Sequence, residues 1–125
     1  MKIVTLIARL LLGLTFVVFG LNGFLHFLPQ PMPDGLAKQY ITALAATAYI
    51  NFVFAIQLIA GLLFLVDRFV ALALTLIAPV IVNILLFHAY MNPGGILPGT
   101  LVTIFWIIVF IQHRAAFTGI FRAQG

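Results

Sequence analysis

Four long apolar runs separated by short polar breaks dominate the pattern along this chain. A helix needs about 20 apolar residues to cross the hydrocarbon core of a bilayer, and the runs approach or exceed that length at residues 3–27, 49–66, 69–90 and 96–111. Backbone inside lipid must satisfy its own hydrogen bonds, so such runs are expected to be helical. The pattern predicts an all-α membrane protein, a bundle of four transmembrane helices in a single domain covering residues 1–125.

The breaks between the runs carry clear turn signals. After the first run, LPQPMPDG combines three prolines, which lack a backbone N–H, with Gly35, which permits a turn. Only Asp67 and Arg68 separate the second run from the third, which predicts a tight hairpin. MNPGGILPG divides the third from the fourth, and its Pro98 suits the first turn of the last helix.

Residues 35–48, GLAKQYITALAATA, show a weaker helical pattern. Apolar or amphipathic side chains recur at helical spacing, whereas the polar ones fall elsewhere. We expect a short amphipathic helix that lies in the membrane interface between the first and second spans. The alternative interpretation is that these residues simply extend the second span at its N-terminus.

The composition agrees with a membrane protein and excludes several functions. Of the 125 residues 65% are hydrophobic and 6% are charged, and the mean hydropathy is +1.28, whereas soluble domains are about 25% charged. The absence of cysteine removes thiolate chemistry, disulfides and cysteine metal sites. The net charge of +4 comes from scattered single cations without a basic stripe, so nucleic acid is not an expected partner. The expected partner of most of the surface is the lipid bilayer.

The positions of the cations predict the orientation. The N-terminal run is too long for a signal peptide and lacks a cleavage site, so it is expected to remain as the first span. With four spans, one side of the membrane has only Lys38, and the other side has Lys2, Arg9, Arg68, Arg114 and Arg122. Lys and Arg concentrate on the cytoplasmic side. We therefore expect a multi-pass protein of a bacterial cytoplasmic membrane with both termini in the cytoplasm.

Polar side chains within the runs gather on particular helix faces. At about 100° per residue, Thr15, Asn22 and His26 of the first run lie within about 40° of one another and form one polar face, which is expected to point into the bundle. Pro79 should kink the third run beside its own polar face. A polar group facing lipid costs free energy, so Asn22, Gln57 and Asn83 are expected to point into the bundle. The alternative role is hydrogen bonding between helices, worth about 0.6 kcal/mol on average. The polar and amphipathic residues of the runs include Thr15, Asn22, His26, Asn51, Gln57, Thr75, Asn83, Thr100, Thr103, Trp106 and Gln112.

Two histidines are candidate ligand contacts. His26 and His88 close the first and third runs, each beside a Pro/Gly loop, and are expected at the same depth. A neutral imidazole there can bind a quinone carbonyl or serve as axial ligand to a haem or chlorophyll, and the alternative is an amphipathic residue at headgroup level. No metal is expected, because only Asp34 is nearby as a carboxylate. His26, His88, Asn22 and Gln57 are the candidate cofactor contacts, although the sequence requires no cofactor.

Other polar or small residues have structural interpretations. Arg9 can snorkel to the interface or pair with Asp67. Small residues along the first run, Gly13, Gly20 and Gly23, permit a neighbouring helix to approach closely. Thr75 and Asn83 join Arg9 as structural polar residues. No phosphate loop, Ser–His–Asp set, HExxH motif or carboxylate pair is present, so no catalytic residue is predicted.

The order of these features resembles the DoxX family of small four-helix bacterial membrane proteins. The similar segments are ARLLLGLTFVVFGLNGFLHFLP and QLIAGLLFLVDRFVALALTLIAPVIVNILLFHAYMNP, with Arg9 and Gly13 spaced as Arg-x-x-x-Gly. The resemblance implies association with respiratory or other oxidoreductase assemblies. Many members have glutamate in place of Gln57 and often lysine in place of Asn22. The neutral amides of this chain favour a hydrogen bond between them over proton transfer.

Three functions follow as expectations. The first is a non-catalytic accessory subunit at the lipid-facing edge of a larger membrane oxidoreductase or electron-transfer complex, with the other subunits as partners. The second is a redox subunit that itself handles quinone. The third is a small carrier, for which a bundle of four short helices barely has room.

Overall fold

The computed structural model of the protein describes residues 2–27 and 33–123 and is helical over most of them. Four of its helical segments are long and apolar enough to cross a membrane. The predicted all-α bundle is therefore confirmed, and the chain is a multi-pass membrane protein. Its elements are α1 (Lys2–Leu25), α2 (Leu36–Ala46), α3 (Tyr49–Val66), α4 (Val70–Tyr90), the 3-10 turn η1 (Pro93–Gly95), α5 (Ile96–His113) and the 3-10 segment η2 (Arg114–Phe121).

The predicted boundaries agree with the helices to within two residues. The first run was expected to be helical through Phe27, but α1 ends at Leu25. The last span continues to His113, two residues further than expected, and leads into η2, which the sequence pattern did not predict. Pro29 and Pro31, which were expected to mark the exit from the bilayer, lie outside the described residues.

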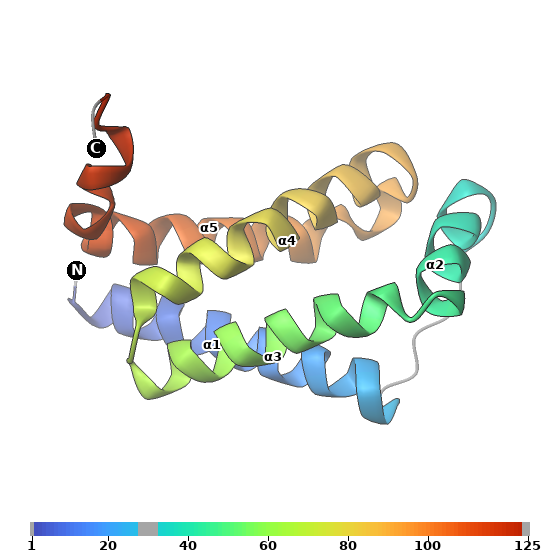
Figure 1. Ribbon diagram of the computed structural model, residues 1–125, viewed down its shortest axis with the longest axis horizontal. Coiled ribbons are helices and arrows are strands. Elements are labelled where there is room, and N and C mark those ends of the chain that lie inside the picture. The colour runs from blue at the N-terminus through green and yellow to red at the C-terminus, as the bar shows by residue number, and fades with distance from the viewer. Residues whose placement is uncertain (1, 28–32, 124–125) are drawn as a thin grey trace.

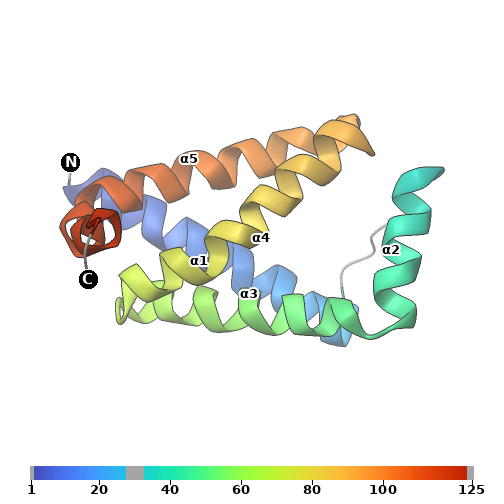
Figure 2. The ribbon, with the colours of Figure 1, turned by 45° about the horizontal axis from the view of Figure 1, so that its top comes forward.

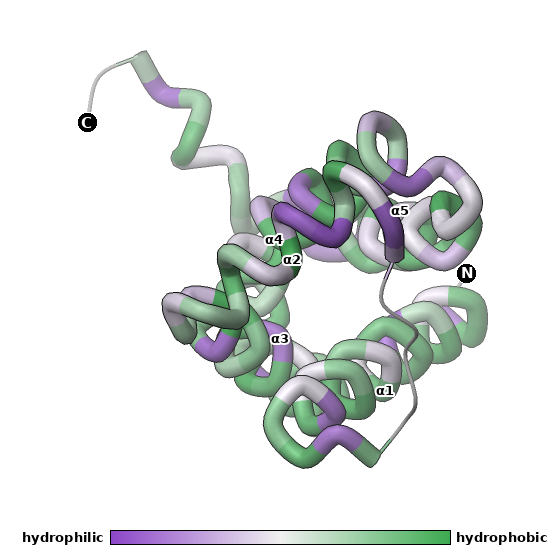
Figure 3. Tube along the Cα trace, turned by 90° about the vertical axis from the view of Figure 1, so that its right-hand side faces the viewer, coloured by the Kyte–Doolittle hydropathy of each residue, from purple (hydrophilic) through white to green (hydrophobic). Residues whose placement is uncertain are grey.

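The four long helices form two antiparallel hairpin-like pairs, α1 with α3 and α4 with α5 (Figure 1). Each long helix contacts two others, so that α1, α3, α4 and α5 surround the bundle axis when viewed from the end near α2 (Figure 3). The N- and C-termini lie together at the opposite end (Figure 1). We call these the α2 end and the terminal end of the bundle.

Helix α2 stands across the bundle at its α2 end and does not continue α3 (Figure 2). The chain turns sharply between them because Ala48 adopts a left-handed conformation with φ of 59°. The interpretation of residues 35–48 as an N-terminal extension of the second span is therefore excluded. A separate short helix lies between the first and second spans, as predicted.

The contact between α1 and α3 depends on glycine. A Cβ atom built on Gly61 would lie 2.7 Å from the backbone nitrogen of Val17 and 2.9 Å from the carbonyl oxygen of Gly13. One built on Gly20 would lie 2.9 Å from the nitrogen of Leu58, and one on Gly23 would overlap the Phe54 ring. The close approach predicted for Gly13, Gly20 and Gly23 is confirmed, with Gly61 as their counterpart on α3.

The buried centre of the bundle lies nearer the terminal end. Its fully enclosed side chains come from all four long helices and include Leu12, Phe64, Leu74, Ile77 and Val109. The indole Nε1 of Trp106 donates a hydrogen bond of 3.0 Å to the carbonyl of Leu74, which ties α5 to α4. Many other large apolar side chains are exposed on the outside of the helices, as expected for surfaces that contact lipid.

Arg9 joins the first turns of α1 to the last turn of α3. Its guanidinium donates to the carbonyl oxygens of Phe64 and Leu65, the latter at 3.4 Å, and its Nε lies 3.7 Å from Oδ1 of Asp67. The last carbonyls of a helix lack their usual helical donors. Arg9 provides a donor to the carbonyl of Leu65 and a second donor to that of Phe64, which also accepts from the backbone N–H of Asp67. Of the two arrangements expected for Arg9, the structure has the pair with Asp67.

Replacing Arg9 with methionine should destabilise the protein more than replacing Asp67 with asparagine. Arg9→Met leaves the partly buried carbonyl of Leu65 without its side-chain donor and removes one donor from that of Phe64, which costs about 1–3 kcal/mol. The Asp67 side chain is 62% exposed, and exposed ion pairs contribute only about 0–1 kcal/mol. Thermal unfolding of both variants in one detergent measures the difference. Equal losses would show that the ion pair, rather than the carbonyl contacts, holds the two helices.

Candidate functional site

The two helix pairs diverge toward the α2 end (Figure 1). Two adjoining chambers lie there. The core chamber, of about 370 Å³, is bounded by α1, α3, α4 and the start of α5. The side chamber, of about 400 Å³, is bounded by α2, α3 and α4. Both volumes fall within the roughly 300–1,000 Å³ typical of small-molecule sites. Phe54, Gln57, Ile84 and His88 line both chambers and form their shared wall.

The walls of both chambers are mainly apolar. Apart from Gln57 and His88, the core chamber has one other polar side chain, Thr15, whose hydroxyl donates 2.7 Å back to the carbonyl of Leu11. Among the described lining residues of either chamber there is no Asp, Glu, Lys or Arg. The chambers therefore suit a neutral ligand. The apolar side chains that surround the core chamber are Phe16, Phe19, Phe54, Ile81, Ile84, Pro98 and Val102.

Gln57 is the central polar group of the shared wall. It comes from the middle of α3 and is only 7% exposed. No side chain or backbone group among residues 2–27 and 33–123 forms a hydrogen bond with its carboxamide. The amide atoms are not sealed inside the protein, so the carboxamide faces the open space of the chambers. Gln57 thus presents two N–H donors and one oxygen acceptor to whatever occupies the chambers.

The expected amide pair between α1 and α3 does not form. Asn22 is buried, with 5% exposed, as predicted, but no hydrogen bond joins it to Gln57 within the described residues. Asn22 is also absent from the described lining of both chambers. Of the two buried amides, only Gln57 is positioned to meet a ligand there.

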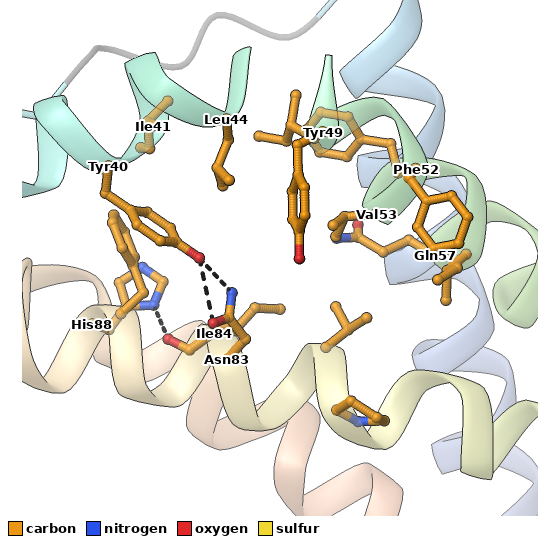
Figure 4. A pocket seen from close by; sticks show the side chains of 16 residues that line it. Tyr40, Ile41, Leu44, Tyr49, Phe52, Val53, Gln57, Asn83, Ile84 and His88 are labelled. Carbon is orange, nitrogen blue, oxygen red and sulfur yellow. Dashed lines mark hydrogen bonds between the residues drawn. The ribbon is translucent and has the colours of Figure 1, made fainter. Parts of the chain in front are cut away.

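His88 is the second polar group of the shared wall. Its Nδ1 lies 2.9 Å from the carbonyl oxygen of Ile84 (Figure 4). Because a carbonyl can only accept, Nδ1 carries the hydrogen, and Nε2 of the neutral ring is an acceptor. The ring packs on Gly95, where a built Cβ atom would lie 2.8 Å from Nε2, and meets the edge of Phe87. An imidazole acceptor and an amide therefore face the same pair of chambers.

The prediction that His26 shares an inward face with Thr15 and Asn22 is wrong. The angular spacing assumes that the helix continues, but α1 ends at Leu25 and His26 has a left-handed φ of 53°. Its backbone N–H still donates to the carbonyl of Asn22 at 2.8 Å. The side chain of His26 is exposed, whereas His88 is half-buried within α4. The two histidines expected at the same depth therefore have different environments.

The prediction that Asn83 points into the bundle is also wrong. The inward face of α4 carries Ile77, Val80 and Ile81, so Asn83 projects toward α2. There its amide nitrogen donates 3.0 Å to the hydroxyl of Tyr40, which lies 3.4 Å from the Asn83 oxygen (Figure 4). Tyr40 was not a predicted site residue, although its helical spacing with Leu36 and Leu44 indicated that these side chains share one face of the amphipathic helix.

Thr75, the other polar residue expected to be structural on this helix, is exposed, and its hydroxyl donates 2.9 Å to the carbonyl of Ala71.

Within the described ranges no three His, Cys, Asp or Glu side chains gather as a metal site would require. The chain matches no family model, no curated protein and no solved structure. The chemistry of the two chambers is therefore inferred from their own residues.

Proposed function

We propose that the protein is a non-catalytic subunit of a membrane-embedded oxidoreductase assembly and that its core chamber binds the ring of a quinone. The observation that carries this proposal is Gln57, a largely buried residue whose carboxamide lines the chambers and has no hydrogen-bond partner among residues 2–27 and 33–123. A quinone carbonyl accepts a hydrogen bond from that amide. The hydroxyl of the reduced form donates to the amide oxygen or to Nε2 of His88. Both forms are neutral, in agreement with the uncharged lining.

The accessory role is supported by the chemistry that the site offers. Gln57, the group that carries the proposal, does not titrate, so it can hold a ring but cannot itself give or take the protons of a redox reaction. The order of Arg9, Gly13, Gly61 and His88 along α1, α3 and α4 supports kinship with DoxX-like proteins, and this kinship is part of the proposal. Catalysis would then belong to other subunits, with this chain presenting quinone to them.

The orientation is part of the same proposal. Five of the six cations belong to the elements and turns of the terminal end, and Lys38 belongs to α2. The positive-inside preference then supports termini in the cytoplasm. The chambers would open toward the outer side of a bacterial cytoplasmic membrane.

Binding to the purified protein tests the proposal. Titration in nanodiscs with a quinone bearing a short alkyl tail should raise the unfolding temperature saturably, because a ligand that binds only the folded state stabilises it by mass action. The control is a dialkylbenzene of the same size without carbonyl groups, which should have little effect. Equal effects of the two compounds would overturn the assignment.

Gentle extraction should also recover the chain in a large particle with redox subunits, and recovery only as a free protein would oppose the accessory role.

A further inference from the structure

The side chamber extends to the outer surface of the bundle near α2. Two of its lining residues on α3, Tyr49 and Phe52, are 62% and 71% exposed. Both belong to the first turn of α3, beside α2 (Figure 4). The outer surface of these helices is apolar and contacts lipid. A molecule in the side chamber can therefore reach the bilayer without passing through water.

The lining of the side chamber offers few polar groups to a ligand. Three polar side chains line it outside the shared wall among the described residues, and two of them, Tyr40 and Asn83, hydrogen-bond to each other. The third is Tyr49, whose hydroxyl is directed toward α4 (Figure 4). The remaining wall is hydrocarbon or aromatic, from α2, α3 and α4: Ile41, Leu44, Ile50, Phe52, Val53, Ile56, Pro79, Val80 and Phe87. A flexible apolar chain suits such a wall better than a second polar ring does.

The two chambers together have the form of a site for an amphiphile. We propose that the side chamber holds the hydrocarbon tail of a ligand whose polar ring lies at Gln57 in the core chamber, and that the tail leaves toward lipid between α3 and α4. This inference rests on the proposed quinone binding and narrows it to tailed, membrane-dissolved quinones. The shared wall provides the continuity, because Phe54, Gln57 and Ile84 border both spaces.

Helix α2 forms one side of the tail site. Ile41 and Leu44 project from it into the side chamber (Figure 4), while Ala45 on the same helix is exposed. Leu44→Trp should fill the chamber, and Ala45→Trp adds the same bulk outside it. Comparing the two variants therefore distinguishes the effect of filling the chamber from the effect of adding an indole to α2.

The test compares one quinone ring with and without a decyl tail, with both concentrations expressed per lipid in nanodiscs. Wild type and Ala45→Trp should bind both compounds. Leu44→Trp should bind the tailless ring as wild type does but the tailed one about tenfold more weakly, because the tail overlaps the indole. Undiminished binding of the tailed quinone by Leu44→Trp would overturn the tail site. Failure of wild type to bind even the tailless ring would instead overturn the proposed function.

A second measurement uses the wild-type protein and avoids any question of folding. A quinone with a photoreactive group at the end of its tail should label side-chamber residues such as Leu44 and Phe52. Labelling of core-chamber residues such as Val102 would place the tail in the wrong chamber and overturn the inference. A bilayer acyl chain in the side chamber is the competing occupant, and it would leave labelling unspecific and insensitive to an excess of unlabelled quinone.

Discussion

Gly61→Leu should separate α1 from α3 and lower the free energy of unfolding by at least about 3 kcal/mol. Overpacking a core by a methylene or two costs about 1–3 kcal/mol when side chains can shift. Here the obstructing atoms are the backbone nitrogen of Val17 and the carbonyl oxygen of Gly13, within 2.9 Å of the built Cβ atom. Backbone atoms move only if the helix moves. The substitution therefore opens the contact that holds the two helices together.

Thermal unfolding followed by circular dichroism in one detergent measures this effect. Gly119→Leu is the matched control, because nothing lies within 4 Å of a Cβ atom built at that position. It should unfold close to the wild-type temperature. Similar losses in the two variants would mean that leucine is harmful for reasons unrelated to the α1–α3 contact.

Gln57→Leu should have opposite effects on stability and on binding. Leucine fills a similar volume without an amide, so the ligand-free protein should be more stable, because an apolar side chain replaces an amide in a mainly apolar wall. The affinity for the short-tailed quinone should fall by about tenfold to a hundredfold, because a ring carbonyl would then be buried without a donor. Few substitutions in a packed bundle raise stability while abolishing a ligand contact.

The control for this experiment is Gln112→Leu, the same change at an exposed position of α5 away from both chambers. Unfolding temperature and quinone titration should be close to wild type. A loss of stability in Gln57→Leu would show that the amide serves the packing of the bundle. Unchanged affinity would remove Gln57 from the ring site.

The spans and their order could be predicted because a backbone in lipid must satisfy its own hydrogen bonds. A run of apolar residues in a bilayer must be helical, and Pro79 interrupts α4 without ending it. Gly35, just before α2, and Ala48, just after it, have positive φ and mark its limits, but only the glycine is visible as a turn signal.

The direction in which each helix faces was harder to predict. In a soluble bundle an apolar stripe marks the core, but in a membrane the outside is as apolar as the inside. The spacing of Thr75 and Asn83 correctly implied a shared face but did not reveal that this face lies outside the central bundle. For His26 the angular argument was wrong because the helix had already ended.

The candidate site was predicted in part. Gln57 and His88, named on separate grounds, border the same chambers, whereas Asn22 and His26 do not line them among the described residues. The chambers exist because two helix pairs diverge at one end. The angle between two packed helices depends on both partners, so it cannot be predicted from the residues on one helix face.

The turn between α3 and α4 contributes to the site although it lies at the far end of the bundle. It consists of three residues, and two of them, Asp67 and Phe69, are held in left-handed conformations. One inserted or deleted residue would rotate α4 by about 100° relative to α3. His88 would then leave the wall that it shares with Gln57. The length of this turn thus sets the register of the binding site, and lineages that keep the site should tolerate changes of residue there but not changes of length.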